Sequence, residues 1–365
     1  MKTVQLLAGS AVALALLASC EQRGYKIEGT GEALADGDTL FLTTDLTAMT
    51  PSDTIVIKDG KFTLSGQTDS TFFCLLYSAT NPELAMPFFI EPGNIRLTLP
   101  KDMEKARVEG TLCNQQWQVV NDSMAVMSKR MNQLAMQMYT ATDEAQAAKL
   151  QGEVEGVMNK FRQFIFEQGK KNISNEFGYF ITTFYSDGLL EPEQVKELVG
   201  MLPEAMSQRQ PVKQLKEQLN LLQDTAEGAT IKDFRQKNLE GKEVSLLDEV
   251  RQHKLTVLDF WASWCGPCRQ AMPHVVKLYE SYKDKGLGIV GISLDEDGDS
   301  WAAAVQELGM TWLQMSDLKG WNNQIAKAFG VKAIPHMVVV DQQGRIVSSS
   351  IMADKLEPLL KERLQ

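Results

Sequence analysis

The fold of the C-terminal part is decided by residues 255–269, which read LTVLDFWASWCGPCR. The first half, up to Phe260, is an apolar run that predicts a buried strand. The second half places Cys265 and Cys268 where a helical pattern begins. Because free N–H groups and the helix dipole stabilise negative charge there, this position favours the reactive thiolate of Cys265. Cys268 follows one turn later, close enough to close a disulfide.

The residues around this stretch predict strands alternating with helices. Residues 266–285, 300–308, 324–329 and 353–363 have helical patterns, and residues 288–293, 336–341 and 345–347 have strand patterns. Such alternation implies an α/β sheet with crossover connections.

Residues 258–269 resemble the active-site segment of the thioredoxin superfamily, in its extracytoplasmic TlpA/ResA-like branch. Ala333-Ile334-Pro335-His336 matches the cis-proline loop of that family. The resemblance covers about residues 227–365. It implies a thioredoxin-like fold and thiol–disulfide exchange with proteins.

The resemblance also implies catalytic roles for three residues. Cys265 attacks a disulfide and forms a mixed disulfide, which Cys268 then resolves. Asp259, six residues before Cys265, matches the buried carboxylate that exchanges protons with the second cysteine. Burial beside a thiol is expected to raise its pKa.

The predicted substrate-binding residues surround the dithiol. A cis Pro335 would expose the Ile334 backbone to an extended substrate. Trp264 would flank the disulfide as an apolar contact, and Gly266 and Pro267 form a tight, stiff turn. The full predicted set is therefore Trp264, Gly266, Pro267, Ile334 and Pro335.

Two positions depart from the family pattern. Ala271 stands where many members have glutamate, so proton transfer falls more heavily on Asp259. His336 stands where threonine is common, as either a thiolate-stabilising imidazole or a partly exposed variant residue. The chain has no second CxxC and no close His pair, so neither a metal nor a cofactor is expected.

The first twenty residues are typical of a lipoprotein leader. Lys2 precedes an apolar run that is too short to span a bilayer comfortably and ends in Leu17-Ala18-Ser19-Cys20. This ending resembles a bacterial lipobox, which predicts a signal peptide over residues 1–19 and lipidation of Cys20. The implied location is the periplasmic side of a Gram-negative envelope, with the outer membrane favoured over the inner.

The middle of the chain divides by pattern into two segments. Residues 24–110 alternate short strand patterns with turn signals, including a hairpin signal at Lys58-Asp59-Gly60. They predict an all-β sandwich or barrel, and resemble an uncharacterised β-domain that precedes thioredoxin-like lipoproteins. Residues 111–224 are rich in helix formers. The fold class is therefore multidomain: β-rich, then helical, then a thioredoxin-like α/β domain over residues 227–365.

Composition limits the partners. The 365-residue chain carries 37 basic and 47 acidic residues, a net charge of −10, which disfavours nucleic acid. Of its five cysteines, Cys74 and Cys113 have no assigned role, and either a structural disulfide or two buried thiols would fit.

The sequence thus predicts a membrane-anchored thiol–disulfide oxidoreductase that acts as a reductase. Its partners would be protein disulfide clients and a membrane or periplasmic electron donor. One alternative is a thiol peroxidase, although Ala262 occupies the position where peroxidases usually have threonine. The other is a lipid-anchored binding or scaffold protein.

Overall fold

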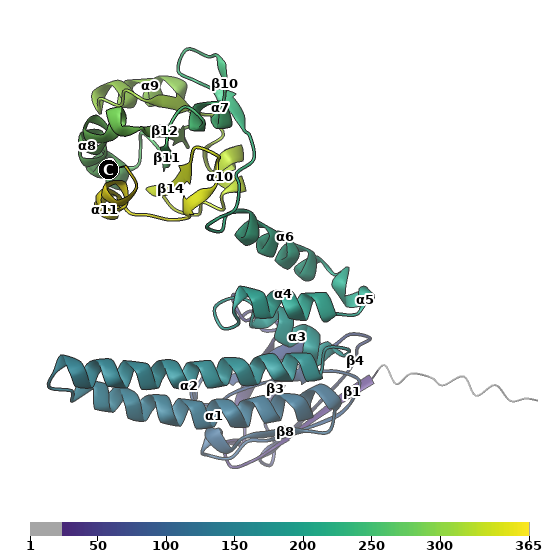
Figure 1. Cartoon of the computed structure of the whole chain (residues 1–365). Helices are drawn as coiled ribbons and strands as arrows, with labels where there is room; N and C mark the ends of the chain where they lie inside the picture. Colours follow the sequence, from purple (N-terminus) through teal and green to yellow (C-terminus); the bar gives the residue numbers. More distant parts are fainter. Residues whose placement is uncertain (1–23, 365) are drawn as a thin grey trace, which may run out of the picture. The chain divides into compact units, whose positions relative to one another are not determined.

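The computed structural model describes residues 24–364 and contains two compact units that divide between Met206 and Ser207. Colours in Figure 1 follow the sequence, from purple and teal in the first unit to green and yellow in the second. The predicted signal peptide and Cys20 lie outside the described residues. Among the residues that are described, no helix is long and apolar enough to cross a membrane.

Two four-stranded sheets form the β-rich part of the first unit, with strand orders β4-β1-β7-β8 and β3-β2-β5-β6. All neighbours pair antiparallel except β1 and β7, which are parallel. The strands are β1 (Gly24–Thr30), β2 (Thr39–Thr43), β3 (Asp53–Val56), β4 (Lys61–Gln67), β5 (Phe72–Ser78), β6 (Ala85–Ile90), β7 (Gly93–Thr98) and β8 (Arg107–Glu109), with a short 3₁₀ turn η1 (Met103–Lys105) before β8.

The hairpin predicted at residues 58–60 is only partly correct. Asp59 and Gly60 form the tight turn, both with positive φ, and Lys58 and Lys61 exchange two backbone hydrogen bonds across it. The flanking strands then separate, because β3 joins the sheet of β2 and β4 joins the sheet of β1. The turn therefore carries the chain from one sheet to the other.

The helices of the first unit share a core with the strands. They are α1 (Leu112–Tyr139), α2 (Glu144–Lys171), α3 (Glu176–Phe184), α4 (Pro192–Met201) and α5 (Glu204–Ser207), whose last residue already belongs to the second unit. Phe89 of β6 lies 6.3 Å from the Trp117 ring of α1 and 5.0 Å from Phe180 of α3, measured between ring centroids. Such aromatic pairs add to apolar burial, so the strands pack as one body with α1 and α3.

Glu91 joins the sheet to the start of α1. Its buried carboxylate accepts hydrogen bonds from the N–H groups of Cys113 (2.8 Å) and Asn114 (3.3 Å). The N-cap residue Thr111 makes no side-chain cap bond of its own to the helix. A carboxylate from the turn between β6 and β7 therefore satisfies the orphan donors and complements the helix dipole.

The second unit is the predicted α/β domain. Its sheet has the order β13-β12-β11-β14-β15, with β11, β12 and β13 parallel and β14 and β15 antiparallel. The elements in chain order are α6 (Gln210–Asp224), β9 (Arg235–Lys237), β10 (Glu243–Ser245), α7 (Leu246–Val250), β11 (Leu255–Trp261), α8 (Gly266–Tyr282), η2 (Lys283–Lys285), β12 (Leu287–Ser293), α9 (Gly298–Glu307), β13 (Leu313–Met315), η3 (Gly320–Asn322), α10 (Gln324–Ala328), β14 (His336–Asp341), β15 (Ile346–Ser348) and α11 (Ala353–Arg363).

Every residue of β11 and β12 is buried. This is the expected consequence of parallel strands covered on both faces, and it explains their continuous apolar runs. The C-terminal end of β11 leads directly into the loop before α8, so the sheet fixes where the two cysteines lie (Figure 1).

Candidate active site

Cys265 and Cys268 lie at the start of α8 and are joined by a disulfide, with 5.3 Å between their Cα atoms. Cys265 is the N-cap residue, and its Sγ accepts a hydrogen bond from the Cys268 N–H at 3.2 Å. Both cysteines are nearly buried, while Trp264, Gly266 and Pro267 beside them are exposed. A partner molecule would therefore meet these three residues around the disulfide.

The Asp259 side chain is enclosed in the centre of the sheet. Asp259 is buried on β11. Its neighbours in the sheet are Gly291 of β12 on one side and Met337 of β14 on the other. Its Oδ2 has no hydrogen-bond partner among the described residues. Burial raises the pKa of this carboxyl to about 7. It therefore changes protonation near neutral pH, as a proton carrier must.

The Ile334–Pro335 peptide bond is cis, as expected from the sequence. It precedes β14, where His336 pairs with Phe260 at the end of β11. This register brings the proline loop to the same end of the sheet as the dithiol segment.

The His336 ring is half-buried and lies 5.9 Å from the Phe260 ring, between centroids. Desolvation lowers the pKa of this imidazole, although a backbone hydrogen bond at Ser349 opposes the shift. The ring is therefore mostly neutral at pH 7.

Asp295 is a buried residue that sequence reasoning missed. Its carboxylate accepts hydrogen bonds from the Ser263 N–H, at 3.0 and 3.2 Å, and from the Ser263 hydroxyl. It also accepts from the Ser293 hydroxyl at 2.7 Å. The loop that leads into Cys265 is thus bonded to the end of β12.

Trp321 was also missed. Its ring, in η3, lies 6.2 Å from the ring of Trp264, between centroids. Both rings reach the surface, with 56% of Trp264 and 46% of Trp321 exposed. No local sequence signal links the two, because 56 other residues separate them and only the fold brings them together.

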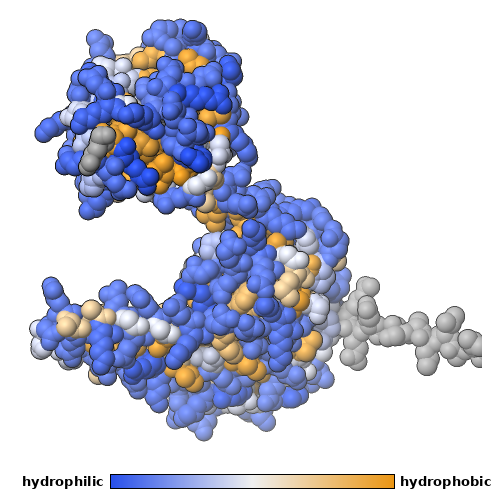
Figure 2. Space-filling view, viewed as in Figure 1, coloured by the Kyte–Doolittle hydropathy of each residue, from blue (hydrophilic) through white to orange (hydrophobic). Residues whose placement is uncertain are grey.

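An apolar cavity of about 330 Å³ adjoins the proline loop. Ala271 of α8, Pro335 and Met337 line it together with residues 351–354. Figure 2 shows apolar residues at the surface in the region of β14 and α11. At position 271 the wall of this cavity is the methyl group of an alanine.

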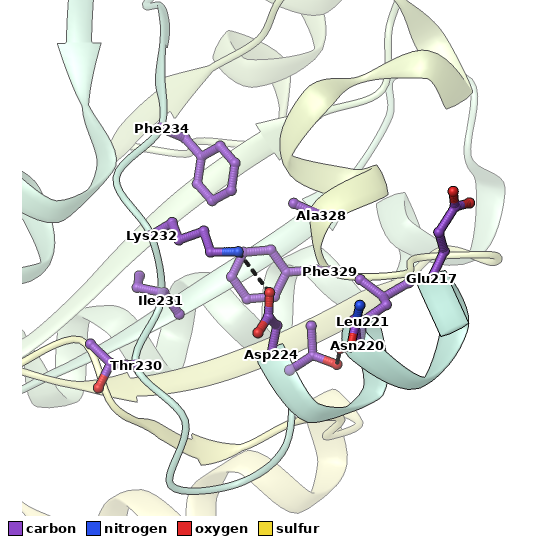
Figure 3. Close-up of a pocket in the computed structure, with 11 residues that line it drawn as sticks. Glu217, Asn220, Leu221, Asp224, Thr230, Ile231, Lys232, Phe234, Ala328 and Phe329 are labelled. Atoms are coloured by element: carbon purple, nitrogen blue, oxygen red, sulfur yellow. Dashed lines mark hydrogen bonds and ion pairs between the residues drawn. The ribbon is translucent and has the colours of Figure 1, made fainter. Parts of the chain in front are cut away.

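A second cavity, of about 290 Å³, lies between α6 and the segment around Thr230–Phe234 (Figure 3). The Lys232 ammonium bonds the Asp224 carboxylate at 2.7 Å there, and the Phe329 ring forms part of the wall. None of the predicted site residues lines this cavity. Among residues 24–364, no group of three His, Cys, Asp or Glu side chains is placed to hold a metal ion.

Cys74 and Cys113 do not form a disulfide in the structure, and both are buried free thiols. Cys74 lies on β5, where its Sγ–H donates to the Phe88 carbonyl at 3.3 Å. Cys113 lies at the start of α1 beside Glu91. Burial raises the pKa of both thiols, so they are poor nucleophiles in the folded chain.

The fold and the dithiol at a helix start define a thioredoxin-type domain. Residues 226–362 match the family model Redoxin, and residues 25–117 match a domain of unknown function, DUF4369. The chain is 32% identical over 138 residues to the thiol-disulfide oxidoreductase ResA of Bacillus thuringiensis (strain Al Hakam), covering 37% of this chain and 77% of the relative.

A second ResA, from Geobacillus thermodenitrificans, is 31% identical over 121 residues, covering 33% of this chain and 67% of the relative. Among solved structures, the thioredoxin domain of a Bacteroides vulgatus thiol-disulfide oxidoreductase is 29% identical with a TM-score of 0.36, covering 38% of this chain and 99% of that one. The chain belongs to the TlpA/ResA-like thiol–disulfide oxidoreductases of the thioredoxin superfamily.

Proposed function

We propose that this enzyme reduces disulfides of client proteins through Cys265 and Cys268, from an envelope membrane to which a lipid on Cys20 anchors it. The observation that carries the proposal is a buried disulfide at the start of α8, surrounded by exposed Trp264, Gly266 and Pro267. Only a partner that docks against Trp264, Gly266 and Pro267 can therefore reach the two sulfurs.

The chemistry begins with the reduced dithiol. The Cys265 thiolate attacks one sulfur of the client disulfide, forming a mixed disulfide and releasing the other client sulfur as a thiolate. The Cys268 thiol then loses its proton to the Asp259 carboxylate and attacks the Cys265 sulfur. The second client sulfur leaves and takes up a proton. Two electrons have passed to the client, and the enzyme holds the Cys265–Cys268 disulfide.

Regeneration requires an electron donor in the same compartment. A dithiol protein, soluble or in the membrane, would reduce the Cys265–Cys268 disulfide by the same exchange in reverse. The substrate-binding residues of this proposal are Trp264, Gly266, Pro267, Ile334 and Pro335. The division into a β-rich domain (24–110), a helical segment (111–224) and a catalytic domain (227–365) remains part of the proposal.

Trapping tests the exchange. In Cys268→Ser, the mixed disulfide on Cys265 cannot be resolved, so client proteins should stay attached and be identified by mass spectrometry. Cys265→Ser is the matched control, because it removes the attacking sulfur and leaves the exposed residues Trp264, Gly266 and Pro267 unchanged. Reduction of insulin by Cys265→Ser at the wild-type rate would overturn the proposal. Oxidation by peroxide faster than by protein disulfide would favour a peroxidase instead.

The reaction direction and the anchor are tested separately. Equilibration with glutathione should give a reduction potential near that of thioredoxin, about −270 mV, and far from the roughly −120 mV of a strong oxidant. A fatty-acid label fed to cells should appear on the wild-type chain and be lost in Cys20→Ala. Fractionation of the membranes then distinguishes outer from inner location.

A further inference from the structure

The Trp264 and Trp321 rings form a fixed aromatic surface beside the dithiol. Large aromatic side chains are mostly buried in folded proteins, and a contiguous exposed apolar surface usually marks an interaction site. These two rings are about half exposed and in contact with each other. Trp264 adjoins Cys265 in the chain, so whatever docks on this surface lies beside the reacting sulfur.

The loop that carries Trp321 is rigidly hydrogen-bonded. The Asp317 carboxylate accepts from the Asn323 amide at 3.0 Å and from the Gln324 N–H at 3.1 Å. The Ser316 hydroxyl donates to the Ser293 carbonyl at 2.8 Å, which ties the loop to β12. Asn323 itself is fully buried. The exposure of Trp321 is therefore built into the fold.

The same loop contains backbone strain. Leu318 has a φ of 54°, in the left-handed region that a leucine rarely adopts, and 39% of its surface is exposed. A strained backbone conformation persists only where the surrounding structure holds it in place. Such residues are concentrated at functional sites. The Ser316 hydroxyl accepts from the Leu318 N–H at 3.1 Å, and the bonds of Asn323 and Gln324 to the Asp317 carboxylate close the turn from its other end.

We propose that Trp321 is a client-contact residue. Together with Trp264 it binds a bulky apolar side chain that flanks the reactive cysteine in an extended segment of the client. Aromatic rings bind apolar and especially aromatic side chains through their faces and edges. The occupant is the client segment because this surface is continuous with the disulfide that must meet the client sulfur. This inference rests on the proposed function and specifies the substrate class of that site.

Two short peptides test the preference. Each carries one cysteine in a mixed disulfide with thionitrobenzoate, flanked on both sides by tryptophan in one peptide and by glycine in the other. Release of the coloured thiol gives the second-order rate constant with the reduced full-length protein. The readout is the ratio of the two rate constants, because a general change in Cys265 reactivity cancels in that ratio.

The wild-type chain should react about threefold to tenfold faster with the tryptophan peptide, the range expected for an aromatic contact. Trp321→Ala should lower the ratio to near one, and Trp321→Phe should keep most of it. Leu222→Ala is the matched control and should keep the wild-type ratio, because Leu222 is 53% exposed on α6, an element that carries neither tryptophan.

The outcomes separate the two proposals. A wild-type ratio near one, or an unchanged ratio in Trp321→Ala, would overturn the client-contact role while leaving disulfide exchange intact. If the wild-type protein reacts with neither peptide, or if Cys265→Ser reacts as fast, the proposed function itself fails. Circular dichroism of Trp321→Ala and Trp321→Phe confirms that each variant is folded.

Discussion

The Ser263 N–H donates to both carboxylate oxygens of Asp295, at 3.2 and 3.0 Å, across a gap of 32 positions in the sequence. Ser263 lies two residues before Cys265, and Asp295 lies two residues after the end of β12. Asp295 is therefore a positioning residue for the segment that presents Trp264 and Cys265.

Asp295→Ala should free the dithiol loop. The Ser263 N–H and the two serine hydroxyls lose a charged acceptor, and each bond to a charged group contributes about 1.5–3 kcal/mol. Hydrogen–deuterium exchange of the Ser263 amide should accelerate more than tenfold. Asp295→Asn keeps one carbonyl oxygen and should show a smaller acceleration. Equal exchange in wild type and Asp295→Ala would contradict the positioning role.

Asp259 should make the second unit less stable as pH rises. Its folded pKa of about 7 exceeds the ordinary value of 3.8, so between these values the folded chain holds a proton that the unfolded chain has lost. Stability from this group is complete below about pH 4 and is lost as pH rises through 7. A difference of roughly three pKa units corresponds to about 4 kcal/mol.

Urea unfolding of the oxidised full chain at several pH values measures this effect. Asp259→Asn cannot titrate, so its free energy of unfolding should fall less steeply than that of wild type between pH 4 and 8. Any constant cost of burying the amide shifts the whole curve and leaves its slope unchanged. Parallel curves for the two proteins would exclude the raised pKa.

Two helical glycines of the first unit should respond in opposite ways to alanine. A Cβ on Gly178 in α3 would overlap the Asn172 carbonyl group, which belongs to rigid backbone. Overpacking of this kind costs about 1–3 kcal/mol. Gly156 in α2 has open space around it, so alanine there should stabilise by up to about 1 kcal/mol. Calorimetry of the full chain should therefore show Tm falling for Gly178→Ala and rising for Gly156→Ala.

Cys74 and Cys113 should resist alkylation in the folded protein. Both thiols are buried and have raised pKa values, so little thiolate exists and reagents cannot reach it. Iodoacetamide applied to the native chain at pH 8, followed by peptide mass spectrometry, should leave both unmodified. Unfolding in guanidinium should make both react. Rapid native labelling of either cysteine would show that its segment opens.

The sequence predicts the catalytic domain well because its signals are local. The apolar runs of β11 and β12 and the cysteines at the start of α8 each lie within one short segment. By contrast, β13 was missed, because a strand of three residues, Leu313–Met315, has no readable periodicity and depends on pairing with β12.

Two residues of the site, Asp295 and Trp321, could not be predicted from the sequence for the same physical reason. Asp295 is one carboxylate in an acidic run, and only folding reveals that its oxygens face Ser263. Trp321 looks like an ordinary loop residue until its loop is placed beside Trp264. The hairpin at residues 58–60 shows the converse case: the turn chemistry was correct, but which sheet each strand joined was decided by distant partners.

The central place of β1 has a mechanical consequence. β1 pairs along its length with β4 on one side and with β7 on the other. With the lipid proposed at Cys20, any pull between membrane and protein enters the fold at Gly24 and runs along the strand axis. The hydrogen bonds of the antiparallel β1–β4 pair run across that axis, and those of the parallel β1–β7 pair are slanted to it. Such a load therefore shears both sets of bonds together and does not peel one strand away. The first unit would thus be a strong attachment point for whatever force the envelope transmits.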